Sequence, residues 1–393
     1  MNPRRLLLEL FHEALRSVDG ERSVATALGE LRPGPVALFA IGKAASSMTL
    51  GAFAALGDDV QQTLIITKDG HVDPRVATRP RVRVIESAHP IPDERSLAAG
   101  AELERQLVEL PRGVYPIFLV SGGSSSLVES LRAGSTLDDL RSLNVRGMGS
   151  GWDIARLNTE RGKLSRIKGG GVAALLDGRP AHALFISDVP GDDPGVIGSG
   201  LLGPAVGRTD RVHRLVVANV GAATRCVADA ARARGVELEE RRASFEGEAA
   251  NVAAEFLDAL RQTRADGLVW GGESTVMLPA NPGRGGRNQH LALAAARALR
   301  AGESFTILAA GTDGTDGPTD DAGAIVDSLT VERAELGGAD VERALRDYDS
   351  GLALEAAQDL LHTGPTGTNV GDLLIGIKQD APRARDPTLP RML

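Results

Sequence analysis

Four carboxylates are concentrated in one short segment of this chain, "GTDGTDGPTDDAGA" at residues 311–324. They are Asp313, Asp316, Asp320 and Asp321. A solvated acidic turn would tolerate their mutual repulsion, but the same groups can bind a metal ion, a metal–phosphate complex or a sugar hydroxyl. Their spacing differs from that of an EF-hand loop, so we favour Mg²⁺, which commonly takes one or two carboxylates together with substrate phosphates. We predict Asp313 and Asp316 as metal ligands.

Basic residues at two glycine-rich turns favour an anionic ligand. In "IGKAASSM" (41–48), Lys43 follows an apolar run and begins an expected helix, so the helix N-terminus and the ammonium would attract the same anion. The alternative is a lysine that caps a surface turn. In "GRGGRNQH" (283–290), Arg284 and Arg287 approach a helix through glycines, and their guanidinium groups suit a carboxylate or a phosphate.

Glycines and serines follow a further apolar run in "LVSGGSSSLVE" (119–129). Glycines let a phosphate approach the backbone and hydroxyls donate without bulk, so we predict phosphate or substrate binding there, with an ordinary turn as the alternative. The segment "NTERGKLSRIKGGG" (158–171) gathers four basic residues, which indicate either a polyanion contact or a solvated helix face. They are Arg161, Lys163, Arg166 and Lys168.

The usual nucleotide and zinc motifs are absent from the sequence. A Walker A loop needs glycine five residues before the Gly-Lys pair, where this chain has Ala37 or Leu157. "GSGLLG" (198–203) fits GxGxxG but follows a loop and precedes Pro204, so we assign no dinucleotide site to it. The seven histidines show no HxxxH or HExxH spacing, and the single cysteine, Cys226, excludes an intrachain disulfide.

The elements that must position these residues read as an α/β fold. Continuous apolar runs alternate with amphipathic helical segments, which predicts a doubly wound, mainly parallel sheet covered on both faces. The pattern restarts after about residue 210, so we expect two α/β/α domains, at residues 1–210 and 211–380. Residues 381–393 are rich in Pro and Arg and are expected to be a disordered tail.

The unusual segments follow the expected strands almost every time. Asp188 closes the run 183–188, and Glu273 follows the run that begins at residue 267. Since functional loops gather at the carboxyl ends of strands in such sheets, we expect the site in a cleft between the domains.

Composition excludes several classes of function. The net charge is −8, the pI is near 5.5, and no basic run appears, so nucleic-acid binding is not expected. No apolar stretch has the length of a membrane span, and the N-terminal residues 1–18 read as an amphipathic helix rather than a signal peptide. We therefore expect a cytoplasmic protein without a membrane partner.

The motifs, taken in order, resemble the class II glycerate 2-kinase family, whose C-terminal region is known as the MOFRL domain. The resemblance covers the chain up to about residue 378. It rests on "GKAASSM" (42–48), "HPIPDERS" (89–96), "SGGSSSL" (121–127), "LSRIKGGG" (164–171), "SDVPGDDPGVIGSG" (187–200), "GGESTV" (271–276), "GRGGRNQ" (283–289), "GTDGTDGPTDDAGA" (311–324) and "TGPTGTNVGDL" (363–373).

The resemblance implies a kinase that transfers the γ-phosphate of ATP to the 2-hydroxyl of D-glycerate with Mg²⁺ as cofactor. The family's active-site lysine and arginine correspond to Lys43 and Arg287. This chain departs from the family at His290, where glutamate is usual, and at "TERGK" (159–163) in the basic segment. The substrate- and phosphate-binding candidates are Ser121, Gly122, Gly123, Ser124, Ser125, Lys168, Glu273, Asn288, Thr368 and Asn369.

We expect Lys43, Arg287 and Asp188 to be catalytic. Arg287 would bind the glycerate carboxylate or a phosphate oxygen, Lys43 would offset phosphoryl charge, and Asp188 or Asp313 would orient or deprotonate the 2-hydroxyl. The partners expected are D-glycerate and ATP, with the chain as a monomer or a homodimer. The alternative functions are a hydroxypyruvate reductase and a non-catalytic binding protein for sugar acids.

Overall fold

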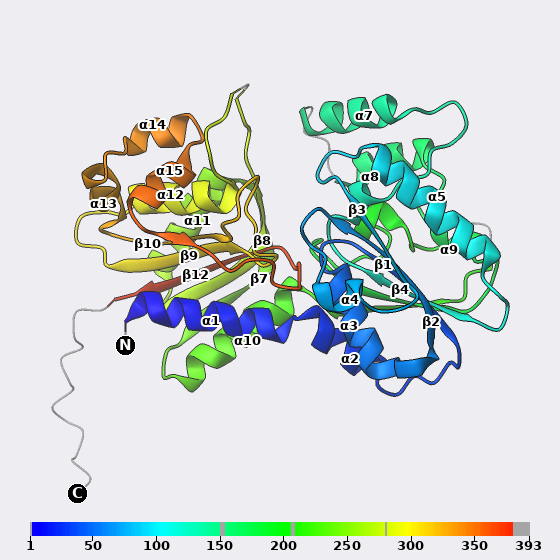
Figure 1. The fold of residues 1–393 in the computed structure, drawn as a ribbon. Coiled ribbons are helices and arrows are strands. Elements are labelled where there is room, and N and C mark those ends of the chain that lie inside the picture. Colours follow the sequence, from blue (N-terminus) through cyan, green and yellow to red (C-terminus); the bar gives the residue numbers. More distant parts are fainter. Residues whose placement is uncertain (1, 150–153, 206–208, 280, 380–393) are drawn as a thin grey trace, which may run out of the picture.

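The computed structural model describes residues 2–149, 154–205, 209–279 and 281–379. The chain forms two lobes side by side, each built around its own β-sheet (Figure 1). The residues expected to form a disordered tail, 381–393, lie outside the described residues.

The first sheet has the strand order β3-β2-β1-β4-β5-β6, and its neighbouring strands are all parallel. Its strands are β1 (Val36–Ile41), β2 (Val60–Lys68), β3 (Val82–Ser87), β4 (Tyr115–Val120), β5 (Ala181–Ile186) and β6 (Val212–Ala218). The strand order reverses between β1 and β4. Such a reversal opens a crevice outside the carboxyl ends of the two strands, and ligands of open α/β sheets bind there.

Helices cover both faces of this sheet because successive strand residues point to opposite sides. Leu38 of β1 packs in the core beneath α2 and α3, whereas Phe39 stacks on Phe118 on the face covered by α5 and α9. The helices of this lobe are α2 (Gly20–Leu28), α3 (Ala45–Leu56), α4 (Pro74–Ala77), α5 (Glu94–Glu109), α6 (Ser124–Leu127), α7 (Leu137–Gly149), α8 (Ile154–Leu164) and α9 (Gly171–Leu175), with 3-10 turns η1 (Gly57–Asp59) and η2 (Ile197–Gly200).

The second sheet is mixed, with the order β11-β10-β9-β12-β8-β7. Only β7 and β8 pair in parallel among its described strands. Its strands are β7 (Leu238–Glu248), β8 (Gly267–Thr275), β9 (Phe305–Gly311), β10 (Gly323–Asp327), β11 (Leu360–Leu361) and β12 (Asp372–Lys378), and its helices are α1 (Pro3–Ser17), α10 (Val220–Ala233), α11 (Ala249–Gln262), α12 (Arg287–Arg297), α13 (Thr330–Leu336), α14 (Val341–Arg346) and α15 (Ser350–Ala356). The predicted fold class, two α/β units with a parallel first sheet, is confirmed.

The division between the lobes does not coincide with the boundary predicted at residue 210. Strand β6 pairs with β5 in the first sheet, so the chain leaves that sheet only after residue 218. Helix α1 also crosses over, because it packs on α10 and against β9 and β12 of the second lobe (Figure 1). Strand pairing and burial decide which sheet an element joins. Neither can be deduced from the point in the sequence at which the strand–helix pattern restarts. No described helix is long and apolar enough to cross a membrane.

Candidate active site

Glycine brings the two loops of the strand-order reversal into contact. A Cβ at Gly42 would lie 2.2 Å from the Ser121 Oγ, and the φ of Gly42 is +129°, so only glycine fits the close approach of the loops after β1 and β4. The backbone N–H of Lys43 donates to the Gly122 carbonyl at 3.0 Å, and the N–H of Ala44 donates to the Ser121 Oγ at 3.0 Å. These bonds fix Lys43 at the crevice where a ligand is expected.

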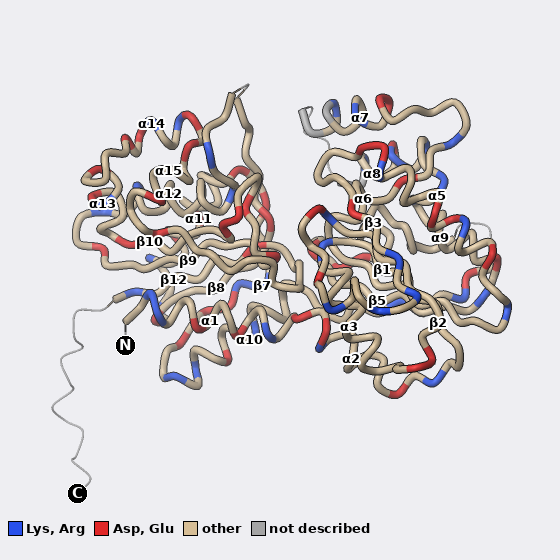
Figure 2. Tube along the Cα trace, in the orientation of Figure 1, with Lys and Arg blue, Asp and Glu red and all other residues tan. Residues whose placement is uncertain are grey.

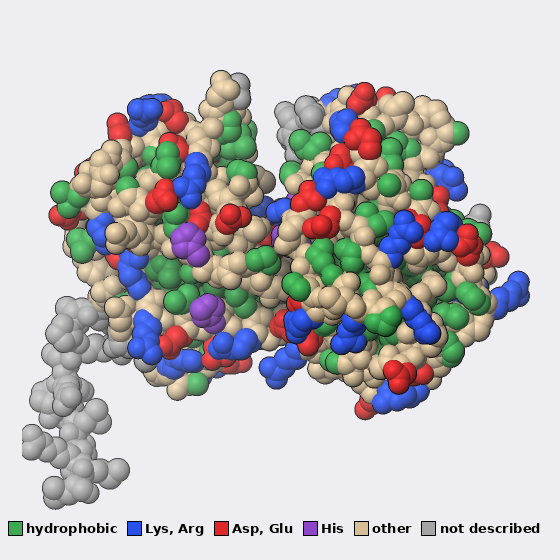
Figure 3. Space-filling view, in the orientation of Figure 1, with side chains coloured by type: hydrophobic (Ala, Val, Ile, Leu, Met, Phe, Trp, Pro, Cys, Tyr) green, Lys and Arg blue, Asp and Glu red, His purple; other side chains and the backbone are tan. Residues whose placement is uncertain are grey.

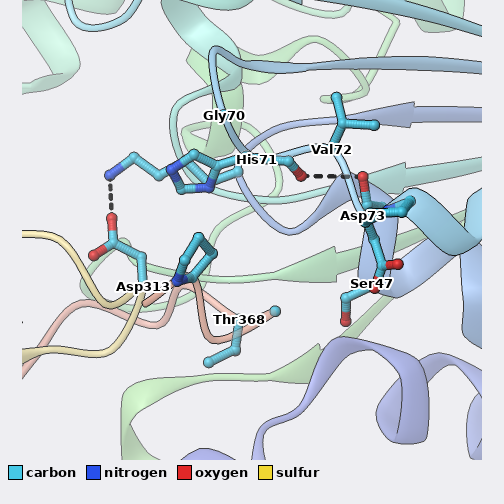
Figure 4. A pocket seen from close by; sticks show the side chains of 12 residues that line it. Ser47, Gly70, His71, Val72, Asp73, Asp313 and Thr368 are labelled. Carbon is cyan, nitrogen blue, oxygen red and sulfur yellow. Dashed lines mark hydrogen bonds and ion pairs between the residues drawn. The ribbon is translucent and has the colours of Figure 1, made fainter. Parts of the chain in front are cut away.

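Lys43 reaches across to the other lobe and pairs with Asp313. Its Nζ lies 2.5 Å from the Asp313 Oδ2 (Figure 4). Burial alone would raise the pKa of Asp313, but the charge and hydrogen bond of Lys43 hold it at about 2. Burial likewise opposes the charge on Lys43, yet the charge and hydrogen bond of Asp313 raise its pKa above the ordinary value. Both side chains are therefore charged at neutral pH.

Asp188, two residues after β5, differs from Asp313 in that its pKa is raised and not lowered. The Nδ2 of Asn369 donates to its Oδ2 at 2.9 Å. Burial raises the pKa of Asp188 to about 7, the charge of Glu273 adds to the shift, and the charges of Lys43 and Arg287 oppose it. Near neutral pH this group can take up and release a proton, which Asp313 cannot.

Arg287, the first residue of α12, is held by two carboxylates. Its Nε and Nη2 donate to the two oxygens of Asp372 at 2.7 and 3.0 Å, and its Nη1 lies 2.6 Å from a Glu273 oxygen. Although burial opposes the charge, these carboxylates raise the pKa of Arg287, so the guanidinium stays charged. About a third of its side chain, 33%, is exposed, which leaves surface for a ligand.

Asp316 is placed to position Arg287. Its carboxylate accepts the backbone N–H of Asn288 at 3.1 Å and of Gln289 at 2.8 Å, so it satisfies the first turn of α12. It is buried, and burial raises its pKa to about 7 against those two hydrogen bonds. The two predicted metal ligands thus have different partners, Asp313 the ammonium of Lys43 and Asp316 the N-terminus of α12. The described residues contain no group of three or more His, Cys, Asp or Glu arranged to hold a metal ion.

The serine-rich loop is supported from inside by Lys168. The Lys168 Nζ is fully buried and lies 2.6 Å from the Ser125 carbonyl oxygen and 3.2 Å from that of Val128, with Glu129 at 3.7 Å. Ser125 bonds through its Oγ to Ser199 at 2.9 Å, and Ser124 is buried. Lys168 and the Ser125–Ser199 bond therefore hold the loop, in which Ser121, Gly122 and Ser124 are buried and Gly123 and Ser125 are half-buried.

The other basic residues of residues 158–171 have local partners. Lys163 pairs with Glu160 at 2.6 Å, and Arg166 lies 3.4 Å from Glu104. The Arg161 Nε donates to Asn144 at 2.9 Å. Lys163 and Arg166 thus fit the alternative of a solvated helix face, whereas Arg161 joins α8 to α7.

A cavity of about 270 Å³ opens between the lobes beside the Lys43–Asp313 pair. Its walls include Lys43, Ser47, His71, Asp73, Asp313 and Thr368 (Figure 4). The loop that carries Thr368 joins the lobes, since the backbone N–H of Gly20, the first residue of α2, donates to the Gly367 carbonyl at 3.3 Å. The Thr368 Oγ1 donates to the carbonyl of Val18, between α1 and α2, at 2.6 Å. Figure 3 shows a furrow between the lobes with basic and histidine side chains in its depth, and Figure 2 shows acidic and basic positions on the segments that border it.

Several residues of the site escaped sequence analysis. His71 lines the cavity, and His89 lies beside Gly123 and Lys43, where burial together with the charges of Lys43 and Lys68 lowers its pKa to about 3. Asp372 begins β12, 85 residues from Arg287, so only the fold could pair them. The signal available for it was its place three residues after the "TGTN" segment (366–369), at the edge of an apolar run.

Two features lie away from this centre. "GSGLLG" (198–203) falls on the 3-10 turn η2 and the turn that follows, not between a strand and a helix. His290 is buried in the second lobe, stacked on Tyr348 with ring centroids 4.6 Å apart and 3.1 Å from the Ser350 Oγ. The departure at His290 thus changes internal packing of α12 rather than the carboxylates around Arg287.

Comparison with known proteins agrees with this architecture. Residues 6–233 match the model of a domain of unknown function (DUF4147), and residues 267–372 match that of the MOFRL family. The chain is 32% identical to the D-glycerate 2-kinase of Thermotoga maritima, over 95% of this chain and 98% of that protein. It is 33% identical to a protein of Agrobacterium vitis named as a hydroxypyruvate reductase, over 95% and 94% of the two chains.

A solved structure extends the likeness to the arrangement of the lobes. The crystal structure of a glycerate kinase from Thermotoga maritima superposes with a TM-score of 0.82 at 33% identity, covering 95% of this chain and 99% of that one. Both family models, the full-length relatives and the shared structure agree, and the chain belongs to the glycerate 2-kinase family.

Proposed function

We propose that this protein transfers the γ-phosphoryl group of ATP to the 2-hydroxyl of D-glycerate, giving 2-phosphoglycerate and ADP. One observation supports this above the others. Two cations, Lys43 and Arg287, and a carboxylate with a pKa of about 7, Asp188, lie close enough in one crevice to shift one another's pKa. The names of the full-length relatives, glycerate 2-kinases of Thermotoga maritima and Pyrococcus horikoshii, support the same substrate.

The charge of each residue would determine its role in the reaction. The exposed side of Arg287 binds the glycerate carboxylate, for which its planar fork is suited. Asp188 accepts the proton of the 2-hydroxyl as the oxygen attacks the γ-phosphorus, and the bond from that phosphorus to the ADP oxygen breaks. Lys43 offsets the negative charge on the transferring group. Most of the rate enhancement then comes from positioning and electrostatics, as in other phosphoryl transfers.

Asp188 is a better base than Asp313, which is the alternative that the sequence left open. A base that acts at neutral pH needs a pKa near 7. The pKa of Asp188 is about 7, whereas Lys43 holds that of Asp313 at about 2. We therefore assign proton transfer to Asp188, while Asp313 orients Lys43 and stays charged for metal binding.

The phosphates of ATP would lie between the serine loop and the beginning of α3. Helix α3 has no side chain that caps its N-terminus, and the buried Oγ of Ser47, which lines the cavity, has no hydrogen-bond partner among the described residues. Unsatisfied donors at a helix N-terminus attract phosphate. Gly123, which is half-buried beside Lys43, would let the phosphates approach the backbone.

We propose that Mg²⁺ accompanies the nucleotide, held by Glu273 and Asp313. Besides burial, the negative charge of Glu273 raises the pKa of Asp188, so the two carboxylates repel each other. A divalent cation near Glu273 would relieve this repulsion. Mg²⁺ would neutralise phosphate charge, and it needs only one or two carboxylates beside the phosphates. Asp316, enclosed at the N-terminus of α12, would act through Arg287.

The test is ³¹P NMR of the purified protein with ATP, Mg²⁺ and D-glycerate. A 2-phosphoglycerate signal that EDTA removes is the expected result, and a 3-phosphoglycerate signal would overturn the assignment of the hydroxyl. The name of the Agrobacterium vitis relative makes a hydroxypyruvate reductase the second candidate. Oxidation of NADH or NADPH with hydroxypyruvate, without any phosphorylated product, would favour that candidate.

A further inference from the structure

A second cavity, of about 230 Å³, has no role in the reaction described above. Its walls come from both lobes: the loop after β5, the beginning of α10, and strands β7 and β8. It borders the proposed active site along the chain, because Asp188 directly precedes its lining residue Val189, and Glu273 follows its lining residue Gly271.

Three arginines line this cavity, and two of them have no partner. In the described part of the chain, Arg225 and Arg242 make no hydrogen bond or ion pair. Arg241 stacks over the Trp270 ring at 5.0 Å and lies 3.4 Å from Glu255. We call Arg225, Arg241 and Arg242 the arginine pocket.

Arginines elsewhere on the same helix are paired. Arg232 lies 2.8 Å from Asp229, and Arg234, at the end of α10, lies 3.3 Å from Glu13. The lack of partners is therefore a property of the cavity and not of α10 as a whole.

The charges inside the arginine pocket do not balance. The carboxylate that lines it is Asp192, whose Oδ2 accepts a short hydrogen bond from the Asn219 side chain. Two unpaired guanidinium groups, those of Arg225 and Arg242, thus share the cavity with one carboxylate, in a chain whose net charge is −8. Unpaired guanidinium groups in a concave wall match phosphate oxygens, to which their planar forks can donate two bonds at once.

The position of Arg225 supports an anion in the same place. A Cβ at Gly221 would lie 3.3 Å from the Arg225 Nη1, so the guanidinium folds back over the first turn of α10. The N-terminal end of a helix is positive, and a cation beside it is unfavourable unless an anion lies there too.

We propose that the arginine pocket binds the phosphate group of a small molecule, at a place separate from Lys43. Two sources have this chemistry, the phosphates of a nucleotide and a phosphorylated three-carbon acid. Because both lobes form the walls, occupation would fix the loop that carries Asp188 relative to the strand that carries Glu273.

Trp270 offers a direct probe because Arg241 lies over its ring. The chain has two tryptophans, so Trp152→Phe leaves Trp270 as the sole tryptophan, which is excited selectively at wavelengths where tyrosine does not absorb. In that background, pyrophosphate, ADP and 3-phosphoglycerate are titrated separately while Trp270 fluorescence is recorded. The variants are Arg225→Ala with Arg242→Ala, the matched control Arg232→Ala on the same helix, and Lys43→Ala.

We expect the double variant to weaken pyrophosphate binding about tenfold or more, while Arg232→Ala and Lys43→Ala leave it within about twofold. Loss of ADP binding with 3-phosphoglycerate unaffected would identify nucleotide phosphates as the source. Loss of 3-phosphoglycerate binding alone would identify the phosphorylated acid. Unchanged affinity for all three ligands in the double variant, or loss only in Lys43→Ala, would overturn the proposal.

Both substituted arginines are solvent-exposed, so the variants are expected to fold, which circular dichroism checks. If the double alanine variant does not fold, the double variant Arg225→Lys with Arg242→Lys keeps both positive charges but removes the planar guanidinium groups. We expect it to bind pyrophosphate about threefold or more weakly. Binding needs no turnover, so a protein that fails to phosphorylate D-glycerate can still pass or fail this test.

Discussion

Lys43, on the loop after β1, and Asp313, on the loop after β9, form an ion pair of 2.5 Å that joins the two sheets. Only 15% and 7% of their side chains are exposed, so water screens the pair little. The cation that the proposed reaction directs at the phosphoryl group is thus also a link between the lobes. Substitutions at this pair are therefore expected to affect both the activity and the stability, and the two effects need separate measurements.

Replacement of Lys43 by alanine should reduce kcat/KM for glycerate phosphorylation by about 10²–10³-fold, because one preorganised positive charge is lost from the site. Release of ADP, measured in a coupled assay, gives the rate. The control is Lys163→Ala, which removes a lysine paired with Glu160 at the surface and should leave kcat/KM within about twofold. Activity near that of the wild type in Lys43→Ala would exclude this lysine from the mechanism.

Asp313 should make stability fall in acid. Its pKa is lowered from 3.8 to about 2, so the unfolded chain binds more protons than the folded chain as the pH drops through this range. Its stabilisation is complete above the unfolded pKa and is lost as the pH falls through the folded pKa. At 1.36 kcal/mol per pKa unit this amounts to about 2 kcal/mol, of which about half is lost by pH 3 and most by pH 2.

Urea unfolding at several pH values tests this prediction. The difference in unfolding free energy between the wild type and Asp313→Asn should shrink by those amounts as the pH is lowered from 5. The matched control is Asp58→Asn, at an exposed aspartate, for which the difference should stay constant. A constant difference for Asp313→Asn as well would show that the ion pair does not persist in solution.

Asp188 should give the pH profile of the reaction its acidic limb. As a base with a pKa of about 7, it must be deprotonated to act, so kcat/KM should rise with pH and level off above about pH 8. Asp188→Asn should lower kcat by about 10²–10⁴-fold and remove that limb from the residual activity. Asp193→Asn, in the same loop, should keep both the rate and the limb. A profile that is flat between pH 5 and 8 in the wild type would overturn the assignment.

Much of this centre could be predicted because its residues follow strands. In a parallel sheet the carboxyl ends of the strands meet at one edge, so Lys43, Ser121 and Asp188 had to converge once the strands were recognised. Which carboxylate pairs with which cation could not be predicted in that way. The pairing of Arg287 with Asp372 depends on an antiparallel strand that arrives from the far end of the chain.

The burial of individual side chains could not be predicted from the sequence either. Lys168 and Asp316 look like ligand-binding residues in the sequence, since each lies in a glycine-rich segment. In the structure Lys168 is buried beneath the serine loop and Asp316 beneath α12. A glycine-rich segment marks a close approach of the backbone, but the partner can be another part of the chain as well as a ligand.

Gly122 offers the last test, because it marks the narrowest point of the site. A Cβ there would lie 1.8 Å from the Asn369 Nδ2 and 1.9 Å from the Asp188 Oδ2, so Gly122→Ala must displace one or both side chains. These are side-chain ends rather than backbone, so the fold should survive while the base moves. A displacement of about 1 Å at a reacting group can cost about 10²-fold in rate. We expect a kcat loss of that size with a melting temperature within a few degrees of the wild type. Gly113→Ala is the control, since a Cβ at that turn meets nothing within 4 Å, and it should change neither quantity. Full activity in Gly122→Ala would mean that Asp188 does not need its bond to Asn369 to act.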